Sequence, residues 1–134
     1  MRLVKTTSTA RIREAADLAY RLEGKTFEHL VLEAEALWVV LDDEGEVVGA
    51  AGAKTSGKNL HLTICFLAPS ARGNGFQKRL IDFRMRWGRK QGCTIVYTYT
   101  YRRNHASMIS LLKMNFSPYY VDRKSNYAYF ARYL

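Results

Sequence analysis

Apolar residues recur at helical intervals in four segments of the chain. The first follows the hydroxyl residues at 7–9 and runs toward Gly24, which suits a helix end. The second covers Phe27 to Ala36. The third extends from about Gly75 to Arg89, with large apolar residues along one stripe and basic residues on the other side. The fourth is short, from the cap residue Asn104 to Met114. We predict a helix in each segment.

Seven other segments have the alternation, or the β-branched and aromatic content, of strands. They are Arg2–Thr6, Leu37–Leu41, Val47–Ala53, Leu60–Leu67, Cys93–Tyr101, Tyr119–Arg123 and Tyr127–Tyr133. In Leu60–Leu67 the residues Leu60, Leu62, Ile64 and Phe66 are predicted to share one side, and His61, Thr63 and Cys65 the other. The order of elements predicts an α/β (α+β) fold, a mixed sheet with helices on its faces, in a single domain over residues 1–134.

Composition adds an expectation about partners and compartment. The 134 residues fit one globular domain, and 21 Lys and Arg against 12 Asp and Glu leave a net charge of +9. This excess indicates an anionic partner, such as nucleic acid, a phosphorylated cofactor or an acidic substrate, or else a generally basic surface. No segment is apolar for long enough to cross a bilayer, and the N-terminal residues lack a signal peptide's apolar core. With Cys65 and Cys93 expected as free thiols, we predict a cytoplasmic protein.

A glycine-containing loop is the clearest candidate for chemistry. Between Leu67 and Leu80 the sequence reads LAPSARGNGFQKRL, so that two glycines precede a predicted helix. Glycine permits close backbone approach, and the N–H groups and dipole of a helix N-terminus attract phosphate. The Walker pattern is absent, and a dinucleotide-binding fingerprint would need glycine where Lys78 stands. The loop therefore predicts a pyrophosphate site of another kind.

The loop resembles motif A of the GNAT superfamily, the acyl-CoA-dependent N-acetyltransferases. That motif is written Arg/Gln-x-x-Gly-x-Gly/Ala. Arg72 fills the first position and Gly75 the second, whereas Gln77 stands where glycine or alanine is usual. The residues just before the loop resemble the end of the family's fourth strand, where a bulge exposes backbone N–H groups to the acetyl carbonyl and the pantetheine arm.

A second stretch, residues 104–116, resembles motif B of the same family. Asn104, Lys113 and Phe116 match the pattern, and Ser107 replaces a small alanine. Position 115 is asparagine instead of glycine, which the left-handed conformation at a helix end also accepts. Leu111 replaces the tyrosine that protonates the leaving thiolate in many members, so this role is vacant here.

The resemblance covers essentially the whole chain and implies a fold, a co-substrate and a set of site residues. The fold is a mixed, mostly antiparallel sheet of about six to seven strands with about four helices. The co-substrate is acetyl-CoA, without a metal, and the acetyl group passes directly to a primary amine in a ternary complex. The implied cofactor-binding residues are Phe66, Leu67, Arg72, Gly73, Asn74, Gly75, Phe76, Gln77 and Asn104, with the backbone N–H of Leu67 directed at the acetyl carbonyl.

His61 is the predicted general base. Several members of the family carry a glutamate base on the fourth strand, and counting back eleven residues from Arg72, as in those members, reaches His61. Imidazole has an ordinary pKa near 6.5, which suits proton removal at neutral pH. A half-buried structural histidine is the competing interpretation. His29 and His105 are expected on the surface, and Tyr127, Tyr129 or His105 are the weaker candidates for a general acid.

Two other classes of function stay open at this point. A non-catalytic acyl-CoA sensor would account for the missing tyrosine, and a nucleic-acid-binding protein would account for the charge and the alternating tyrosines of Val96–Tyr101. The acceptor, a small molecule or a protein amine, is not specified by any motif. A membrane partner is not expected, and a homodimer is left open.

Overall fold

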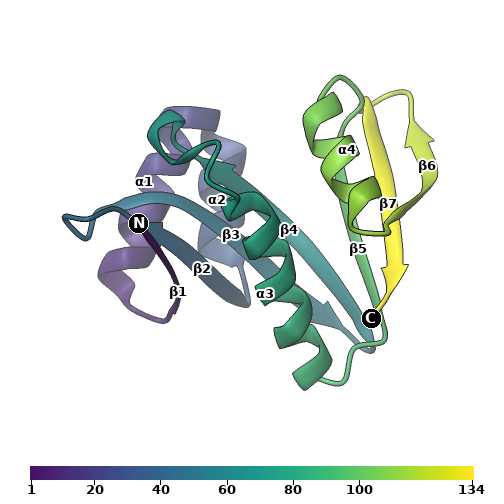
Figure 1. The fold of residues 1–134 in the computed structure, drawn as a ribbon, viewed down its shortest axis with the longest axis horizontal. Helices are drawn as coiled ribbons and strands as arrows, with labels where there is room; N and C mark the ends of the chain where they lie inside the picture. Colours follow the sequence, from purple (N-terminus) through teal and green to yellow (C-terminus); the bar gives the residue numbers. More distant parts are fainter. The chain divides into compact units, whose positions relative to one another are not determined.

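Four helices and seven strands form in the segments that the periodicity predicts. The computed structural model describes all 134 residues (Figure 1). The helices are α1 (Thr9–Glu23), α2 (Lys25–Glu33), α3 (Phe76–Lys90) and α4 (His105–Lys113), and Pro69–Ala71 forms a short 3₁₀ turn. The strands are β1 (Arg2–Thr6), β2 (Ala36–Leu41), β3 (Val47–Ser56), β4 (Asn59–Leu67), β5 (Ile95–Tyr101), β6 (Ser117–Asp122) and β7 (Tyr127–Tyr133).

The strands are hydrogen-bonded in the order β1-β2-β3-β4-β5-β7-β6. β1 with β2, β2 with β3, β5 with β7 and β6 with β7 are antiparallel, whereas β4 and β5 are parallel. The predicted α/β fold, with a mostly antiparallel sheet and four helices, is therefore confirmed.

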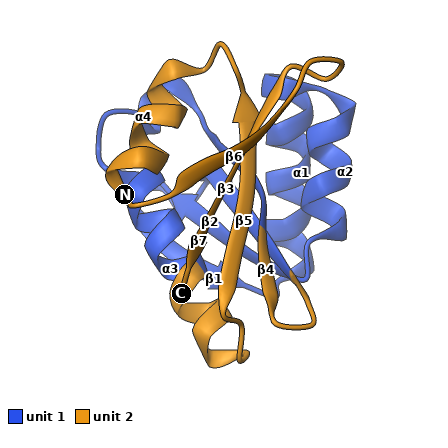
Figure 2. Ribbon diagram, turned by 90° about the vertical axis from the view of Figure 1, so that its right-hand side faces the viewer, with its two compact units in different colours: residues 1–54, 62–84 blue, residues 55–61, 85–134 orange.

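The chain forms two compact units, which are coloured separately in Figure 2. The first contains Met1–Lys54 and Leu62–Arg84, and the second contains Thr55–His61 and Met85–Leu134. A single domain over residues 1–134 stays a prediction.

In the first unit, α1 and α2 pack against each other and contribute to one apolar core. Its buried side chains are Ala15, Ala16, Leu18, Ala19, Val31, Leu37, Val39, Leu41, Val47, Ala50, Ile64 and Phe66. The ends of α1 are those that the sequence predicts, because Ser8 Oγ accepts from the Arg11 N–H at 3.3 Å and Gly24 has a φ of 95°. Helix α2 ends three residues before the predicted limit because Ala36 already belongs to β2.

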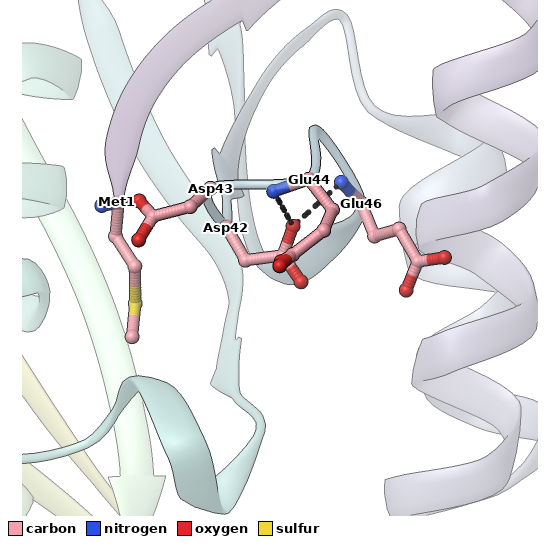
Figure 3. Close-up of polar contacts among 5 residues, drawn as sticks. All are labelled: Met1, Asp42, Asp43, Glu44 and Glu46. Carbon is pink, nitrogen blue, oxygen red and sulfur yellow. Dashed lines mark hydrogen bonds and ion pairs between the residues drawn. The ribbon is translucent and has the colours of Figure 1, made fainter.

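An acidic turn joins β2 to β3, close to the N-terminus (Figure 3). Asp42 Oδ1 accepts hydrogen bonds from the backbone N–H groups of Glu44 at 3.0 Å and Glu46 at 2.9 Å. The N-terminal ammonium of Met1 donates to Asp43 Oδ1 at 3.0 Å. The carboxylates therefore fix the turn between β2 and β3 and tie the start of β1 to it.

In the second unit, α4 lies along β5 and β7 (Figure 1). The residues Val96, Ala128 and Phe130, which share a face of these strands, are buried, as are Leu111 of α4 and Phe116 beyond it. Asn115 ends the helix with a φ of 67°, which confirms the left-handed conformation predicted for it.

Candidate functional site

The loop from Arg72 to Gln77 has the open geometry that an anion site requires. Gly73 and Gly75 adopt positive φ angles of 79° and 76°, which favour glycine, and a Cβ at either position would meet no atom within 4 Å. Arg72 donates through Nε to the Leu67 carbonyl at 3.1 Å. The Asn74 side chain donates to the carbonyls of Ala71 at 3.3 Å and Arg72 at 3.2 Å. These two side chains hold the loop, while its glycines leave the space beside it free.

Donors and cations concentrate where this loop enters α3. The first bond of the helical ladder runs from the Arg79 N–H to the Gly75 carbonyl at 3.2 Å. The N–H groups of Phe76, Gln77 and Lys78 precede it and are those that a helix start leaves for an outside acceptor. The Arg79 guanidinium lies 5.1 Å from the centroid of the buried Phe76 ring, which keeps this cation at the first turn. The arrangement suits a phosphate or pyrophosphate.

The end of β4 offers a main-chain donor next to the loop. The parallel register of β4 with β5 runs from Asn59 to His61, so Leu67, at the other end of β4, lies beyond it. The Phe66 carbonyl oxygen lies toward β3, 2.9 Å from the position of a Cβ on Gly49. Because the peptide bond is trans, the Leu67 N–H points away from β3. The Phe66 side chain belongs to the core, so only its main chain is available to a ligand.

We infer a β-bulge in β4 at Thr63 and Ile64 from the side chains around Gly52. Both side chains approach Gly52: Thr63 Oγ1 would lie 2.8 Å and Ile64 Cγ2 3.1 Å from a Cβ there. Consecutive side chains on one side of a strand are the mark of a bulge. Buried and half-buried residues alternate along β4 as predicted. The side chains, however, do not alternate regularly between the two faces of the sheet. Cys65, predicted to share a face with Thr63, lies instead near Arg84 of α3, whose charge acts on the pKa of its thiol.

Arg84 is a site residue that the periodicity analysis did not single out. Its side chain is only 2% exposed. Nη1 donates to the carbonyls of Gly52 at 3.1 Å and Ile64 at 3.3 Å, and Nε donates to the Leu80 carbonyl at 3.1 Å. Burial lowers the pKa of Arg84, and burial likewise raises the pKa of Cys65. Arg84 thus binds main-chain oxygens of both strands at the bulge.

A sequence signal for Arg84 exists in hindsight. The buried residues Leu80 and Gly88 flank it at intervals of four, which places all three along one helical stripe. The buried residues of α3 include Ile81, Arg84 and Met85, whereas the large apolar residues Phe83 and Trp87 are half-buried. The predicted basic face, with Lys78, Arg79, Arg86, Arg89 and Lys90, is exposed.

His61 is half-buried and stacks on Tyr97. The two residues are the last registered pair between β4 and β5, and their ring centroids lie 5.6 Å apart with an angle of 22° between the planes. Leu60, its neighbour, contacts α3, because a Cβ on Gly88 would lie 2.6 Å from a Leu60 methyl group. Strand alternation therefore turns His61 to the opposite face, which is also the face of Tyr97. His29 and His105 are exposed, as predicted.

Seven tyrosines continue from Tyr97 across three strands, and we call them the tyrosine face. Neighbouring rings lie with centroids 4.6 to 6.4 Å apart. Four members are exposed, up to 57% at Tyr120, so these rings are not part of the core. The members are Tyr97, Tyr99, Tyr101, Tyr119, Tyr120, Tyr127 and Tyr129.

Three hydroxyl groups of the tyrosine face, those of Tyr99, Tyr119 and Tyr127, have a raised pKa. Burial is the main cause that raises the pKa of Tyr99 and of Tyr119. A hydrogen bond with the Tyr101 side chain, followed by burial and the neighbouring tyrosines, raises the pKa of Tyr127 to about 12. Such a group is a weaker acid than an ordinary phenol, so Tyr127 is poorly suited to protonate a thiolate whose pKa is near 8.5.

The motif B residues have mainly structural contacts. Asn104 Oδ1 accepts from the Ser107 N–H at 3.1 Å and caps α4, which leaves the side-chain NH₂ as the group for a ligand. Leu111 is buried, so the position of the family's tyrosine is part of the core here. No group of three or more His, Cys, Asp or Glu residues could hold a metal ion, and no helix is long and apolar enough to cross a membrane.

Comparison with known proteins places this geometry among acetyltransferases. The family model described as "Acetyltransferase (GNAT) family" matches residues 5–116. No curated protein matches the sequence at a significant level.

Solved structures share the fold over three quarters of the chain or more at low sequence identity. An aminoglycoside 6′-acetyltransferase type Ii is 18% identical, covers 99% of this chain and 97% of its own, and has a TM-score of 0.83. An IAA acetyltransferase from Bacillus cereus ATCC 14579 is 14% identical, covers 99% and 100%, and has a TM-score of 0.81. A candidate streptothricin acetyltransferase from Bacillus anthracis strain Ames, in complex with acetyl coenzyme A, is 16% identical, covers 74% and 62%, and has a TM-score of 0.66.

Proposed function

Because the chain belongs to the GNAT acetyltransferase family, we propose that it transfers an acetyl group from acetyl-CoA directly to a primary amine. The observation that carries the proposal is the open loop at the start of α3, next to the end of β4 that lies beyond its register with β5. Such a loop and strand end fit a cofactor with a pyrophosphate and an extended amide-bearing arm. The two free cysteines agree with action in the reducing cytoplasm.

The residues proposed to hold acetyl-CoA divide by the part that they bind. The main-chain N–H groups from Gly73 to Gln77 receive the pyrophosphate, with Arg72 and Asn74 supporting the loop. The Leu67 N–H and the main chain of Phe66 lie at the pantetheine and acetyl end. The side-chain NH₂ of Asn104 is a further donor to the cofactor. When bound, acetyl-CoA supplies an activated acyl group and a thiolate that leaves readily.

The chain's own residues would move one proton and stabilise one charge. His61 takes a proton from the ammonium of the acceptor, because only a neutral amine is nucleophilic. The Leu67 N–H donates a hydrogen bond to the acetyl oxygen as negative charge grows on it. With Leu111 buried and the pKa of Tyr127 near 12, no side chain is assigned as general acid, and the thiolate leaves without one.

A screen of amine classes with acetyl-CoA tests the proposal, with release of free thiol as the readout. The classes are amino acids, peptides with a free N-terminus, polyamines, aminoglycosides and arylamines, each compared with acetyl-CoA alone. We expect amine-dependent thiol release and an acetylated product by mass spectrometry. Binding of CoA without turnover of any amine would replace the proposal by the non-catalytic sensor.

A further inference from the structure

The acidic and basic residues are unevenly distributed along the chain. Residues 1–46 contain six basic and ten acidic residues, whereas residues 47–134 contain fifteen basic and two acidic ones. Residues 91–134, which include the whole tyrosine face, contain six basic residues and a single side-chain carboxylate. That carboxylate, Asp122, accepts from the Lys124 N–H at 3.0 Å and is thereby used within its own turn. A ligand of this region meets excess positive charge.

Four of the six cations of this region lie at one end of the tyrosine face. Arg102 and Arg103 follow β5, and Arg123 and Lys124 lie between β6 and β7. The two turns are neighbours, because the Arg102 N–H donates to the Asn126 carbonyl at 2.9 Å. All four cations are exposed. The positive charge of these two turns therefore lies at one end of the tyrosine face and does not extend along it.

The other end of the tyrosine face reaches His61. Tyr97 stacks on His61 and touches Tyr119, which in turn touches Tyr129. At about 3.3 Å per strand residue, Arg102 lies roughly 16 Å along β5 from the pair of His61 and Tyr97. A path of aromatic rings thus joins the proposed base to the cationic end. It has the length of an extended segment of four or five residues.

We propose that the tyrosine face binds the acceptor, and that the acceptor is an amine on an aromatic, extended body with an anionic group at its far end. The inference rests on the proposed function, since it places the amine at His61. Tyrosine rings contribute stacking area at a small entropic cost, and the four cations select the anion. A polycationic acceptor such as a polyamine or an aminoglycoside is excluded by repulsion. A single-stranded nucleic acid fits less well, because its phosphates need cations along the whole track.

Three tetrapeptide amides serve as matched probes: Gly-Phe-Phe-Glu-amide, Gly-Phe-Phe-Arg-amide and Gly-Ala-Ala-Glu-amide. Each has one free amine and a similar length, and they differ in terminal charge or aromatic content. We expect the first to bind by calorimetry in the presence of CoA, and to be acetylated with a kcat/KM about tenfold above the other two. Raising the salt concentration should reduce the preference for glutamate over arginine and leave the preference for phenylalanine over alanine.

Substitutions in the tyrosine face and at its cationic end test whether these residues cause the charge preference and the aromatic preference. The double variant Arg102→Ser, Arg103→Ser should lose most of the charge preference, whereas Arg2→Ser, Lys5→Ser on β1 removes the same charge elsewhere and should keep it. Tyr99→Leu should lose much of the aromatic preference and Tyr99→Phe should keep it. Tyr120→Ser, at the most exposed member, provides the same test if Tyr99→Leu does not fold.

The outcomes separate this inference from the proposed function. Equal binding of the three peptides, a preference for the arginine peptide, or no binding of any peptide would overturn the inference. If acetyl-CoA still binds and another amine is acetylated, the proposed function stands without it. Tighter binding of an oligouridine than of the glutamate peptide, with steep salt dependence, would reassign the surface to nucleic acid. Loss of CoA binding itself would overturn both.

Discussion

At the scale of one side chain, His61 is the residue proposed to remove the proton from the acceptor amine. His61→Gln preserves the size of the residue and some hydrogen bonding but cannot accept the proton, so kcat should fall by about 10²- to 10⁴-fold. In the wild type kcat/KM should fall at low pH, where the base is protonated, and this acidic limb should flatten in the variant. The matched control is His29→Gln, since His29 is exposed on α2. Near-normal turnover of His61→Gln, with the acidic limb intact, would assign His61 a structural role.

Tyr127 offers a second test at this scale, through its ionisation. The folded chain binds the phenolic proton more tightly than the unfolded chain, because the pKa rises from 10.0 to about 12. The resulting stabilisation is complete below pH 10 and is lost as the pH increases through about 12. With ¹³C-labelled tyrosine, NMR should resolve one ring that titrates near 12, absent in Tyr127→Phe. Tyr101→Phe removes the hydrogen-bond partner and should lower that pKa, and an unchanged value would contradict the assigned cause.

Sequence alone predicted the residues whose role depends on backbone conformation or capping. Ser8, Gly24, Asn104 and Asn115 were identified because caps and positive φ angles have strong residue preferences. Arg84 was missed because a basic residue is normally exposed, and its acceptors, the carbonyls of Gly52 and Ile64, lie far away in sequence.

At the scale of elements, Arg84 connects α3 to β3 and β4 at the inferred bulge. Arg84→Met would leave the carbonyls of Gly52 and Ile64 without this donor, at about 1–3 kcal/mol each, partly offset by removal of a buried charge. We expect a net loss of about 2–3 kcal/mol in the free energy of unfolding, measured by urea denaturation. Arg89→Met, exposed on the same helix, should change it by less than about 0.5 kcal/mol. Equal stability of the two variants would show that the bulge forms without the guanidinium.

The positions of helices and strands were predictable where one face of a segment is buried. They were less predictable where the pattern of apolar residues fits two different arrangements. The seven strands and four helices follow from periodicity, with limits that shift by up to three residues. The bulge at Thr63 and Ile64 left no trace in the sequence, because buried and half-buried residues alternate straight through it. The tyrosines of β5 and β7 fit equally well with packing under a helix, and only the structure shows that α4 takes the other face.

At the scale of the whole molecule, the distribution of basic residues agrees with the proposed binding of a phosphorylated cofactor. Fifteen of the 21 basic residues follow position 46, where the glycine loop, α3 and the tyrosine face lie. A cofactor with several phosphate groups and an anionic acceptor are both attracted by such a field. Composition predicts an anionic partner or a generally basic surface, and only the fold indicates where such a partner would bind.

Thermal denaturation with and without CoA tests the central claim, cofactor binding at the Arg72–Gln77 loop, most directly. At a hundred times its Kd, CoA should stabilise the folded state by about 2.7 kcal/mol, which for a chain of this size corresponds to a shift in Tm of roughly 10 °C. Gly75→Val should abolish the shift. The control is Gly57→Val, which imposes the same kind of strain at a positive φ of 59° in the turn between β3 and β4. A shift in the wild type and Gly57→Val, but not in Gly75→Val, is the predicted result; no shift in the wild type, or an undiminished shift in Gly75→Val, would contradict the claim.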